Sequence, residues 1–227
     1  MLRPKKHITR QKIKEDKFVT ETLRAFEWVK RNQNKLIVGG VVAIIVAFVI
    51  WGSLSARQAA EREASLLTLR GGYELEQGSL EEARIHLLEA VERFGGSPSA
   101  GRATFMLGHI FFRQGAIDSA RGYFEQYLDK YAKKELLRAA AVAGIAACME
   151  QQGDYPGAAR TYEQAARDYK DHPKAAHYLL QAGRSYQLAG QTQQAMAVYE
   201  RIKQDYPDMA EADRAAIEMA QLAQQGG

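Results

Sequence analysis

Residues Gln77–Leu87 read QGSLEEARIHL, and the same arrangement of small and bulky residues returns three more times along the chain. In each copy an alanine follows a glycine by five residues, and a leucine or an aromatic residue follows the alanine by four. The four glycines, separated by 37, 38 and 37 residues, are Gly78, Gly115, Gly153 and Gly190. A regular period of this length predicts a stack of similar structural units.

Each unit is predicted to be an antiparallel pair of helices. The glycine follows an apolar helical stretch, where a helix commonly ends in a left-handed conformation that glycine adopts without strain. Start signals for a second helix come next: Ser79 and Glu82 have the spacing of a capping box, and Asp154 precedes Pro156. The alanine allows close approach of the two helices. We expect the pairs at 58–94, 99–131, 135–169 and 173–206.

The predicted fold class is all-α, with about four hairpins stacked into an α-solenoid, because a single hairpin cannot bury both of its apolar faces. The segment 209–225 follows the last hairpin and predicts a terminal capping helix. Its apolar side is expected to contain Ala212, Ala216, Met219, Ala220 and Leu222.

Upstream of the repeats, Leu36–Ala56 reads LIVGGVVAIIVAFVIWGSLSA and contains no charged residue. As a helix it would reach roughly 31 Å, enough to cross a hydrocarbon core. A buried core helix is one alternative, but a core helix of this length should carry some polar residues on one side, and none occurs here before Ser53. A cleaved signal peptide is the other alternative. The small residues Ser53 and Ser55 before Ala56 favour it, whereas the 35 residues before the apolar segment are longer than the short basic leader of a signal peptide. The sequence therefore predicts a single transmembrane helix.

The charges on the two sides of this segment differ in sign. Residues 1–35 hold eleven Lys and Arg against four Asp and Glu, whereas residues 57–227 hold twenty against twenty-three. Because cytoplasmic segments retain positive charge, the N-terminus is expected inside and the large C-terminal part outside. Three parts follow: a basic cytoplasmic segment at 1–35, a span at 36–56 and an external repeat domain at 57–227.

The basic segment is predicted to contain two pieces. Residues 1–14 are rich in Lys and Arg and poor in apolar residues, so we expect a disordered arm near anionic lipids. Residues 16–32 have one apolar side, formed by Phe18, Val19, Leu23, Phe26 and Val29. This pattern predicts an amphipathic helix on the inner leaflet or on a membrane partner, or a helix that only orients the span.

No motif for catalysis, phosphate binding or metal binding stands out. The single cysteine, Cys148, excludes an internal disulfide, and it is expected to be a small buried residue. The histidines lack metal-binding spacing, and no glycine-rich phosphate loop occurs. We therefore expect no enzyme activity, no metal and no cofactor. The pI near 9.1 reflects basic charge beside a membrane, so we also expect no nucleic acid partner.

The repeat resembles the tetratricopeptide repeat. Small residues Gly71, Gly108 and Gly183 occupy the expected place in the first helix, and Phe111 and Tyr186 follow three residues later. The period is longer than the usual 34 residues, and three positions depart from the pattern, where Ala146, Met149 and Tyr127 stand.

The whole arrangement is similar to the bacterial ancillary SecYEG translocon subunit family, since a basic segment is followed by one span and a repeat domain ending in an alanine-rich helix. That resemblance implies an inner-membrane protein with a periplasmic repeat domain, associated with the export channel and periplasmic chaperones. The repeat domain alone also resembles that of the periplasmic cell-division coordinator.

In the resembled repeat, the first helix of each pair lines a concave face that binds a peptide or a partner helix. The matching positions here are Arg102, Phe105, His109, Phe112, Arg113, His177, Leu180, Arg184 and Gln187. Between them, the third unit offers only Ala140, Ala143 and Ala147, which predict a shallow apolar floor. Such a surface suits an acidic or C-terminal segment. The phenylalanines could instead be ordinary core residues, and the arginines solvated.

The sequence thus predicts a membrane-tethered protein-binding scaffold of the bacterial inner membrane, near the site of export. An envelope-assembly or cell-division scaffold remains open, as does a client-holding periplasmic chaperone. The partner, the stoichiometry and the kind of ligand in the groove are not determined by the sequence.

Overall fold

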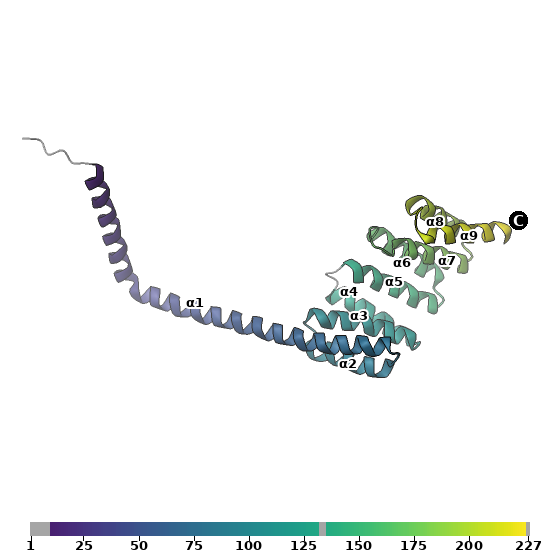
Figure 1. Cartoon of the computed structure of the whole chain (residues 1–227), viewed down its shortest axis with the longest axis horizontal. Coiled ribbons are helices and arrows are strands. Elements are labelled where there is room, and N and C mark those ends of the chain that lie inside the picture. Colours follow the sequence, from purple (N-terminus) through teal and green to yellow (C-terminus); the bar gives the residue numbers. More distant parts are fainter. Residues whose placement is uncertain (1–9, 132–134, 226–227) are drawn as a thin grey trace, which may run out of the picture. The chain divides into compact units, whose positions relative to one another are not determined.

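The computed structural model describes residues 10–131 and 135–225, and every regular element in these ranges is an α-helix (Figure 1). The helices, with their bounds, are α1 (Arg10–Glu76), α2 (Leu80–Phe94), α3 (Pro98–Arg113), α4 (Ile117–Lys130), α5 (Glu135–Gln151), α6 (Tyr155–Asp168), α7 (Ala175–Leu188), α8 (Thr192–Asp205) and α9 (Ala210–Gln225). The chain divides into two compact units, 1–57 and 58–227.

The first unit consists of the N-terminal part of α1. Its apolar side chains between Val19 and Trp51 are exposed, and α1 is long and apolar enough to span a membrane by length and composition. The predicted helix at 16–32 is present, but it continues into the apolar segment without a break. The predicted arm at 1–14 is partly wrong, because α1 begins at Arg10; residues 1–9 lie outside the described part of the chain.

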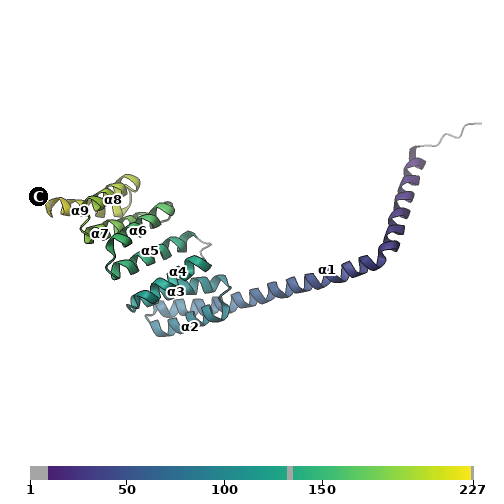
Figure 2. The same ribbon diagram turned by 180° about the vertical axis from the view of Figure 1, so that it is seen from behind.

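The second unit is the solenoid, in which the pairs α3/α4, α5/α6 and α7/α8 stack in chain order, as the reverse view also shows (Figure 2). The predicted hairpin turns are confirmed. Each turn glycine has a φ between 70° and 83°, the left-handed region. At Gly78 the turn is a Schellman motif, in which Ser79 N–H donates to the Glu74 carbonyl at 2.9 Å and Gly78 N–H to the Leu75 carbonyl at 3.2 Å. The other three turns repeat both hydrogen bonds.

Close packing within each hairpin follows from the predicted pairs of small and large residues. A Cβ added to Gly108 would lie 2.7 Å from the Phe124 ring, and one added to Gly183 would lie 2.2 Å from the Tyr199 ring. Both rings are buried, as are Ala120 and Ala195 in the same second helices. The first-helix glycine therefore makes room for the bulky residue of the second helix.

Neighbouring hairpins are joined by a recurring hydrogen bond that explains the glutamine before the turn glycine. Gln114 donates to Glu81 at 2.9 Å, and Gln152 donates to Asp118 at 2.7 Å. In both cases the acceptor lies in the first turn of the second helix of the preceding hairpin. The third joint has Ala189 and Pro156 at these positions and therefore lacks this bond.

Two local predictions need correction. Ser79 makes no capping hydrogen bond, so the capping box is absent, whereas Asp154 accepts from Gly157 N–H at 2.9 Å as expected. In α9 the buried side contains Ala212, Ala215 and Leu222, and Ala216 and Ala220 are exposed. The contact side is rotated by one residue because α9 packs against both α8 and α7.

Candidate protein-binding groove

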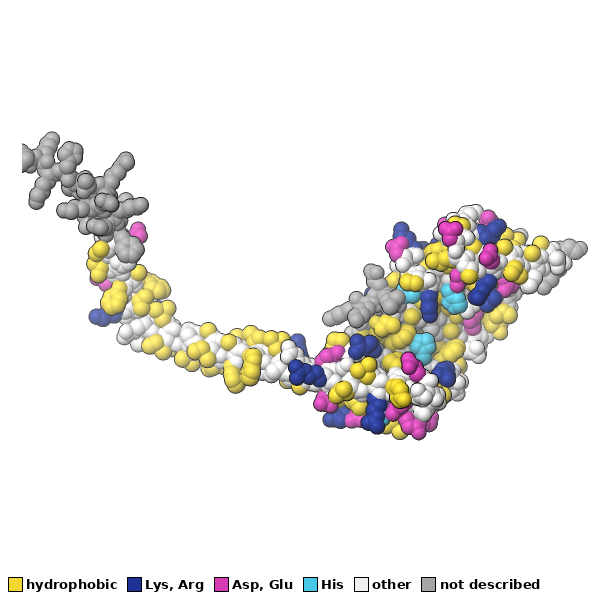
Figure 3. All heavy atoms as spheres, in the orientation of Figure 1, with side chains coloured by type: hydrophobic (Ala, Val, Ile, Leu, Met, Phe, Trp, Pro, Cys, Tyr) yellow, Lys and Arg dark blue, Asp and Glu magenta, His cyan; other side chains and the backbone are white. Residues whose placement is uncertain are grey.

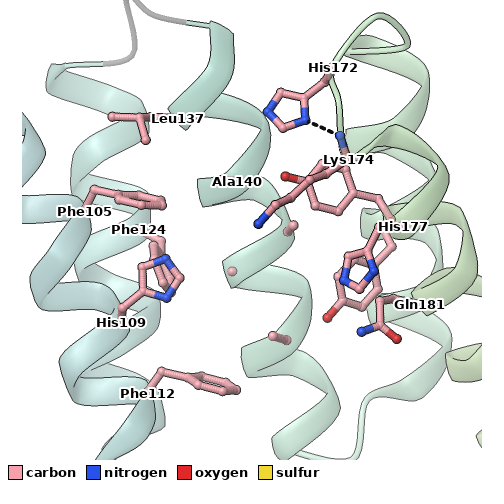
Figure 4. A pocket seen from close by; sticks show the side chains of 15 residues that line it. Phe105, His109, Phe112, Phe124, Leu137, Ala140, His172, Lys174, His177 and Gln181 are labelled. Carbon is pink, nitrogen blue, oxygen red and sulfur yellow. Dashed lines mark hydrogen bonds between the residues drawn. The ribbon is translucent and has the colours of Figure 1, made fainter. Parts of the chain in front are cut away.

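A cavity of about 450 Å³ opens between the first helices of the second, third and fourth hairpins (Figure 4). Helices α3, α5 and α7 contribute most of its surface, with additions from α4, α6 and the turn before α7. The lining residues are Phe105, His109, Phe112, Phe124, Leu137, Ala140, Ala143, Gly144, Ala147, Tyr162, His172, Lys174, His177, Tyr178 and Gln181.

Small side chains on α5 form the floor of this cavity. Ala140, Ala143 and Ala147 line it, as the sequence predicts for the third hairpin. Gly144 lies among them, where an added Cβ would be 2.7 Å from the Phe124 ring. Because α5 presents so little side-chain volume, α3 and α7 stand above it as two walls, and a groove remains.

The wall on α3 is aromatic. The rings of Phe105 and His109 meet edge to face with centroids 4.7 Å apart, and His109 meets Phe124 in the same way at 5.2 Å. Phe112, one turn further along, also points into the groove (Figure 4). Edge-to-face contacts fix these rings against one another, so this wall is a preformed surface for apolar side chains.

The opposite wall carries polar and cationic groups. His172 accepts a hydrogen bond at Nδ1 from Lys174 N–H at 3.0 Å, and its ring stacks on Tyr178 with centroids 5.6 Å apart. His177 and Gln181 lie on the next turns of α7 and face the α3 wall (Figure 4). The ammonium of Lys174 is exposed at the rim.

The electrostatics of the groove favour a negatively charged ligand. Desolvation by the aromatic rings packed against it lowers the pKa of His109, although one side of its ring is open to the groove, and the charge of Lys174 lowers this pKa further. Desolvation also lowers the pKa of His177, although the carboxylate of Glu211 opposes the shift. No lining residue is an Asp or Glu, within the residues that the structure describes. The groove therefore presents the ammonium of Lys174 with no carboxylate among its described lining residues.

Of the nine residues predicted for the binding surface, four line the groove: Phe105, His109, Phe112 and His177. The prediction for Leu180 is wrong, because this side chain is fully buried in the core of the last two hairpins. Gln187 accepts a hydrogen bond from the Tyr199 hydroxyl at 2.6 Å, and Arg184 is paired with Glu218. Neither of these lines the groove.

The two remaining arginines also lie outside this cavity. Arg102 donates to the Ser99 hydroxyl at 2.6 Å and lines a second cavity near the turn between α2 and α3. Arg113 is exposed at the C-terminal end of α3.

The sequence analysis did not identify His172, Lys174, Tyr178 and Gln181, which form the α7 wall. Two of them precede α7 in a turn, where helical periodicity gives no information. Tyr178 directly follows the predicted residue His177. A large aromatic residue at this place, next to a third hairpin with small side chains, is the one feature of the sequence that could have indicated its position in the groove.

Figure 3 shows histidine and hydrophobic side chains together on the exposed surface of the repeat domain. Within the described residues, no group of three His, Cys, Asp or Glu side chains could hold a metal ion.

Comparison with known proteins supports the repeat assignment. Residues 69–135 match one model of the tetratricopeptide repeat, and residues 144–172 and 178–208 match another model of this repeat, so that the matches cover more than half of the chain. No curated protein sequence matches.

Among solved structures, PilF of Pseudomonas aeruginosa is 24% identical, with a TM-score of 0.52, over 69% of this chain and 67% of that chain. A protein of Podospora anserina described as a kinesin light chain with nearly identical TPR-like repeats is 20% identical, with a TM-score of 0.60, over 74% of this chain and 88% of that chain. At these identities the likeness concerns the fold alone. Together with the matched repeat models and the observed hairpins, it places this chain in the tetratricopeptide-repeat family.

Proposed function

We propose that this chain is a non-enzymatic scaffold that binds a segment of a partner protein in the groove between α3, α5 and α7. Tetratricopeptide repeats imply protein partners, and the groove is the observation that carries the proposal. Its floor is smooth and apolar, its α3 wall is aromatic, and its α7 wall is cationic. A surface of this kind suits contact with side chains of a peptide.

The ligand is a segment with a bulky apolar residue beside a carboxylate. The rings of Phe105 and Phe112 would bury the apolar side chain. On the other wall Lys174 would attract the carboxylate, and the neutral imidazole of His177 would donate a hydrogen bond to it. Charge-assisted hydrogen bonds to a carboxylate are stronger than neutral ones. Arg113, near the end of the groove, would add long-range attraction that is weakened by salt.

Residues 36–56 would hold this scaffold in the bacterial inner membrane, with residues 1–35 in the cytoplasm and 57–227 in the periplasm. The opposite net charges of the flanking segments support this orientation. In this position the scaffold would act as an accessory factor at the protein-export translocon and link it to periplasmic chaperones or clients. An envelope-assembly or cell-division scaffold without contact to the translocon has the same architecture.

The apolar lining favours a second candidate, a client-holding chaperone. Phe105, Phe112 and Leu137 form a partly exposed apolar surface that could also bind unfolded segments without a sequence preference. A chaperone should suppress aggregation of an unfolded protein added in trans. A docking scaffold should not do so and should instead discriminate between peptides.

Filling the groove tests the binding proposal. The full chain in detergent is titrated with fluorescent peptides that share one apolar sequence and carry either acidic or basic flanks, and binding is followed by anisotropy. Ala140→Trp places an indole on the groove floor and should abolish binding of the acidic peptide. Ala197→Trp, on the exposed side of α8, is the matched control and should bind normally. Equal binding by both variants would contradict the groove assignment.

The orientation is tested by labelling introduced cysteines in a Cys148→Ala background. Glu82→Cys, on α2, should react with a membrane-impermeant maleimide in intact spheroplasts. Glu21→Cys, on the other side of the span, should react only after lysis. Both side chains are exposed, so their intrinsic reactivities are comparable. The reverse pattern would contradict a periplasmic repeat domain.

A further inference from the structure

The first hairpin exposes three register positions, of which the outer two are buried in every later hairpin. Leu66, Leu69 and Tyr73 are 63%, 67% and 64% exposed. One repeat later the same register positions hold Ala103, Met106 and Ile110, of which the first and last are fully buried. The positions of Ala103 and Ile110 are held by Ala141 and Cys148 in the third hairpin, and both are fully buried. In the fourth hairpin they are held by Tyr178, which is 3% exposed, and Ser185, which is fully buried.

The outer two positions face the preceding hairpin, whereas Gly144 and Gln181, at the middle position of the third and fourth hairpins, line the groove. Ala103 and Ile110 of α3 belong to one core cluster with Ala83, Leu87 and Ala90 of α2. At the other end of the solenoid, α9 covers the last hairpin by packing on α7 and α8. Within the described residues of the repeat domain, nothing equivalent covers α1. The solenoid therefore has one closed end and one apolar open end, although a terminal repeat in water needs a polar outer face.

The exposed residues of α1 in the repeat domain follow a heptad pattern. Leu66, Leu69 and Tyr73 are spaced by three and four residues, and the series continues at Ala59, Arg62 and Glu76. All six side chains are exposed. This spacing places them on one stripe, which is the pattern for packing against a second helix along a shared axis.

We infer that this stripe, Ala59–Arg62–Leu66–Leu69–Tyr73–Glu76, binds the same stripe of a second copy of the chain in a parallel pair. The parallel direction rests on the membrane anchor of the proposed function, because two copies in one bilayer point the same way. The second α1 would cover this end of the solenoid, as α2 covers Ala103 and Ile110 of α3. The pair is two-fold symmetric and closes without forming a filament.

Charge and side-chain size agree with a parallel pair. In a parallel pair Arg62 of one copy lies opposite Arg62 of the other. Glu63 occupies the neighbouring heptad position, where its carboxylate lies beside the guanidinium of the other copy and offsets this repulsion. Ser65 and Gly72, the residues before Leu66 and Tyr73, have small side chains and add little bulk beside the stripe. Anchoring in a bilayer raises the effective concentration, so a stripe of three large apolar residues is sufficient where it would be weak in solution.

Disulfide formation in membranes tests both the contact and its direction. In a Cys148→Ala background, Leu69→Cys and Tyr73→Cys should each give a band of twice the chain mass upon mild oxidation. Arg62→Cys should also link to itself, because a parallel pair brings equal positions together. Ile85→Cys, on the exposed side of α2, is the control for random collision and should stay monomeric.

Three results would overturn the inference: equal linking at Ile85→Cys, a product whose mass includes another polypeptide, or linking at Leu69→Cys without linking at Arg62→Cys. The last would indicate an antiparallel pair. As a second measurement, energy transfer between donor-labelled and acceptor-labelled copies of the full chain in lipid vesicles should be lost in Leu69→Glu and kept in Ile85→Glu. Peptide binding in the groove should be unchanged in Leu69→Glu, so that a failure of this inference and a failure of the groove proposal remain distinguishable.

Discussion

Arg184 on α7 donates two hydrogen bonds to Glu218 on α9, at 3.1 and 3.2 Å. The repeat pattern predicts that this guanidinium contacts a ligand. In the structure it instead forms an ion pair that links the terminal helix α9 to the last hairpin. The positive charge of the groove therefore comes from Lys174, just before α7, and not from the arginine on α7.

Replacing Arg184 should have a small and purely structural effect. Because the Arg184 side chain is 44% exposed, Arg184→Ala should lower the free energy of unfolding by less than about 1 kcal/mol and leave peptide affinity unchanged. Urea unfolding and peptide anisotropy measure the two quantities. Arg201→Ala removes a similarly exposed pair with Asp205 on α8 and serves as control. If Arg184→Ala lowers the peptide affinity and Arg201→Ala does not, Arg184 contacts the peptide after all.

The Phe124 ring lies between two glycines, Gly108 on α3 and Gly144 on α5, and an added Cβ on either would come within 2.7 Å of it. Gly144→Ala should therefore destabilise the chain by about 1–3 kcal/mol through overpacking. Gly122→Ala, in the exposed part of α4 with open space around it, should stabilise by about 0.5–1 kcal/mol. Urea unfolding compares them, and a neutral Gly144→Ala would show that the Phe124 ring of α4 can move aside.

The two predicted helix starts should respond differently to alanine. Asp154 accepts a hydrogen bond from Gly157 N–H, so Asp154→Ala should cost about 1 kcal/mol. Ser79 makes no such bond, so Ser79→Ala should change the free energy of unfolding by no more than a few tenths of a kcal/mol. Thermal unfolding measures both. Equal losses would show that Ser79 caps α2 in solution.

The hairpins could be predicted from the sequence because their determinants are local. A glycine at the left-handed position, such as Gly153, and a small residue facing a ring, such as Gly183 facing Tyr199, act within one repeat and recur at one period. The small floor of the groove at Ala140 and Ala147 followed from the same register.

The α7 wall could not be predicted in the same way, because it depends on how the third and fourth hairpins pack. His172 and Lys174 lie in a turn, outside any helical period, and reach the groove only through the path of the chain into α7. Leu180 was placed in the groove by analogy with the repeat pattern, whereas the packing of α7 turns it into the core and turns Gln181 outward.

Cys148 should react slowly with thiol reagents in the folded protein. Burial raises the pKa of this thiol to about 11, and the reactive thiolate is therefore scarce at pH 8. Maleimide labelling should be more than about a hundredfold slower than in the urea-unfolded chain, because an unfolded thiol has a pKa near 8.5. Rates followed by mass spectrometry decide this, and similar rates would mean that α5 opens to water.

The last prediction concerns acid. The pKa of His109 and that of His177 are lowered by desolvation, so both rings bind protons more weakly in the folded chain than in the unfolded one. Their contribution to stability is therefore complete above the unfolded pKa of about 6.5 and is lost as the pH falls through the folded values. The free energy of unfolding should decrease between about pH 7.5 and 5.5, before most carboxylates titrate.

Two variants separate the histidines from other causes of acid sensitivity. His109→Phe removes one titrating group and should flatten the decrease. Lys174→Gln should flatten it to a smaller extent, because Lys174 lowers the pKa of both rings and desolvation remains. Urea unfolding at a series of pH values gives the slopes. If both variants lose stability as steeply as the parent chain, proton binding at the groove does not control its acid stability. If the variants are flatter, the same protonation that destabilises the free groove raises its positive charge, and an acidic peptide should bind more tightly at pH 5.5 than at pH 7.5.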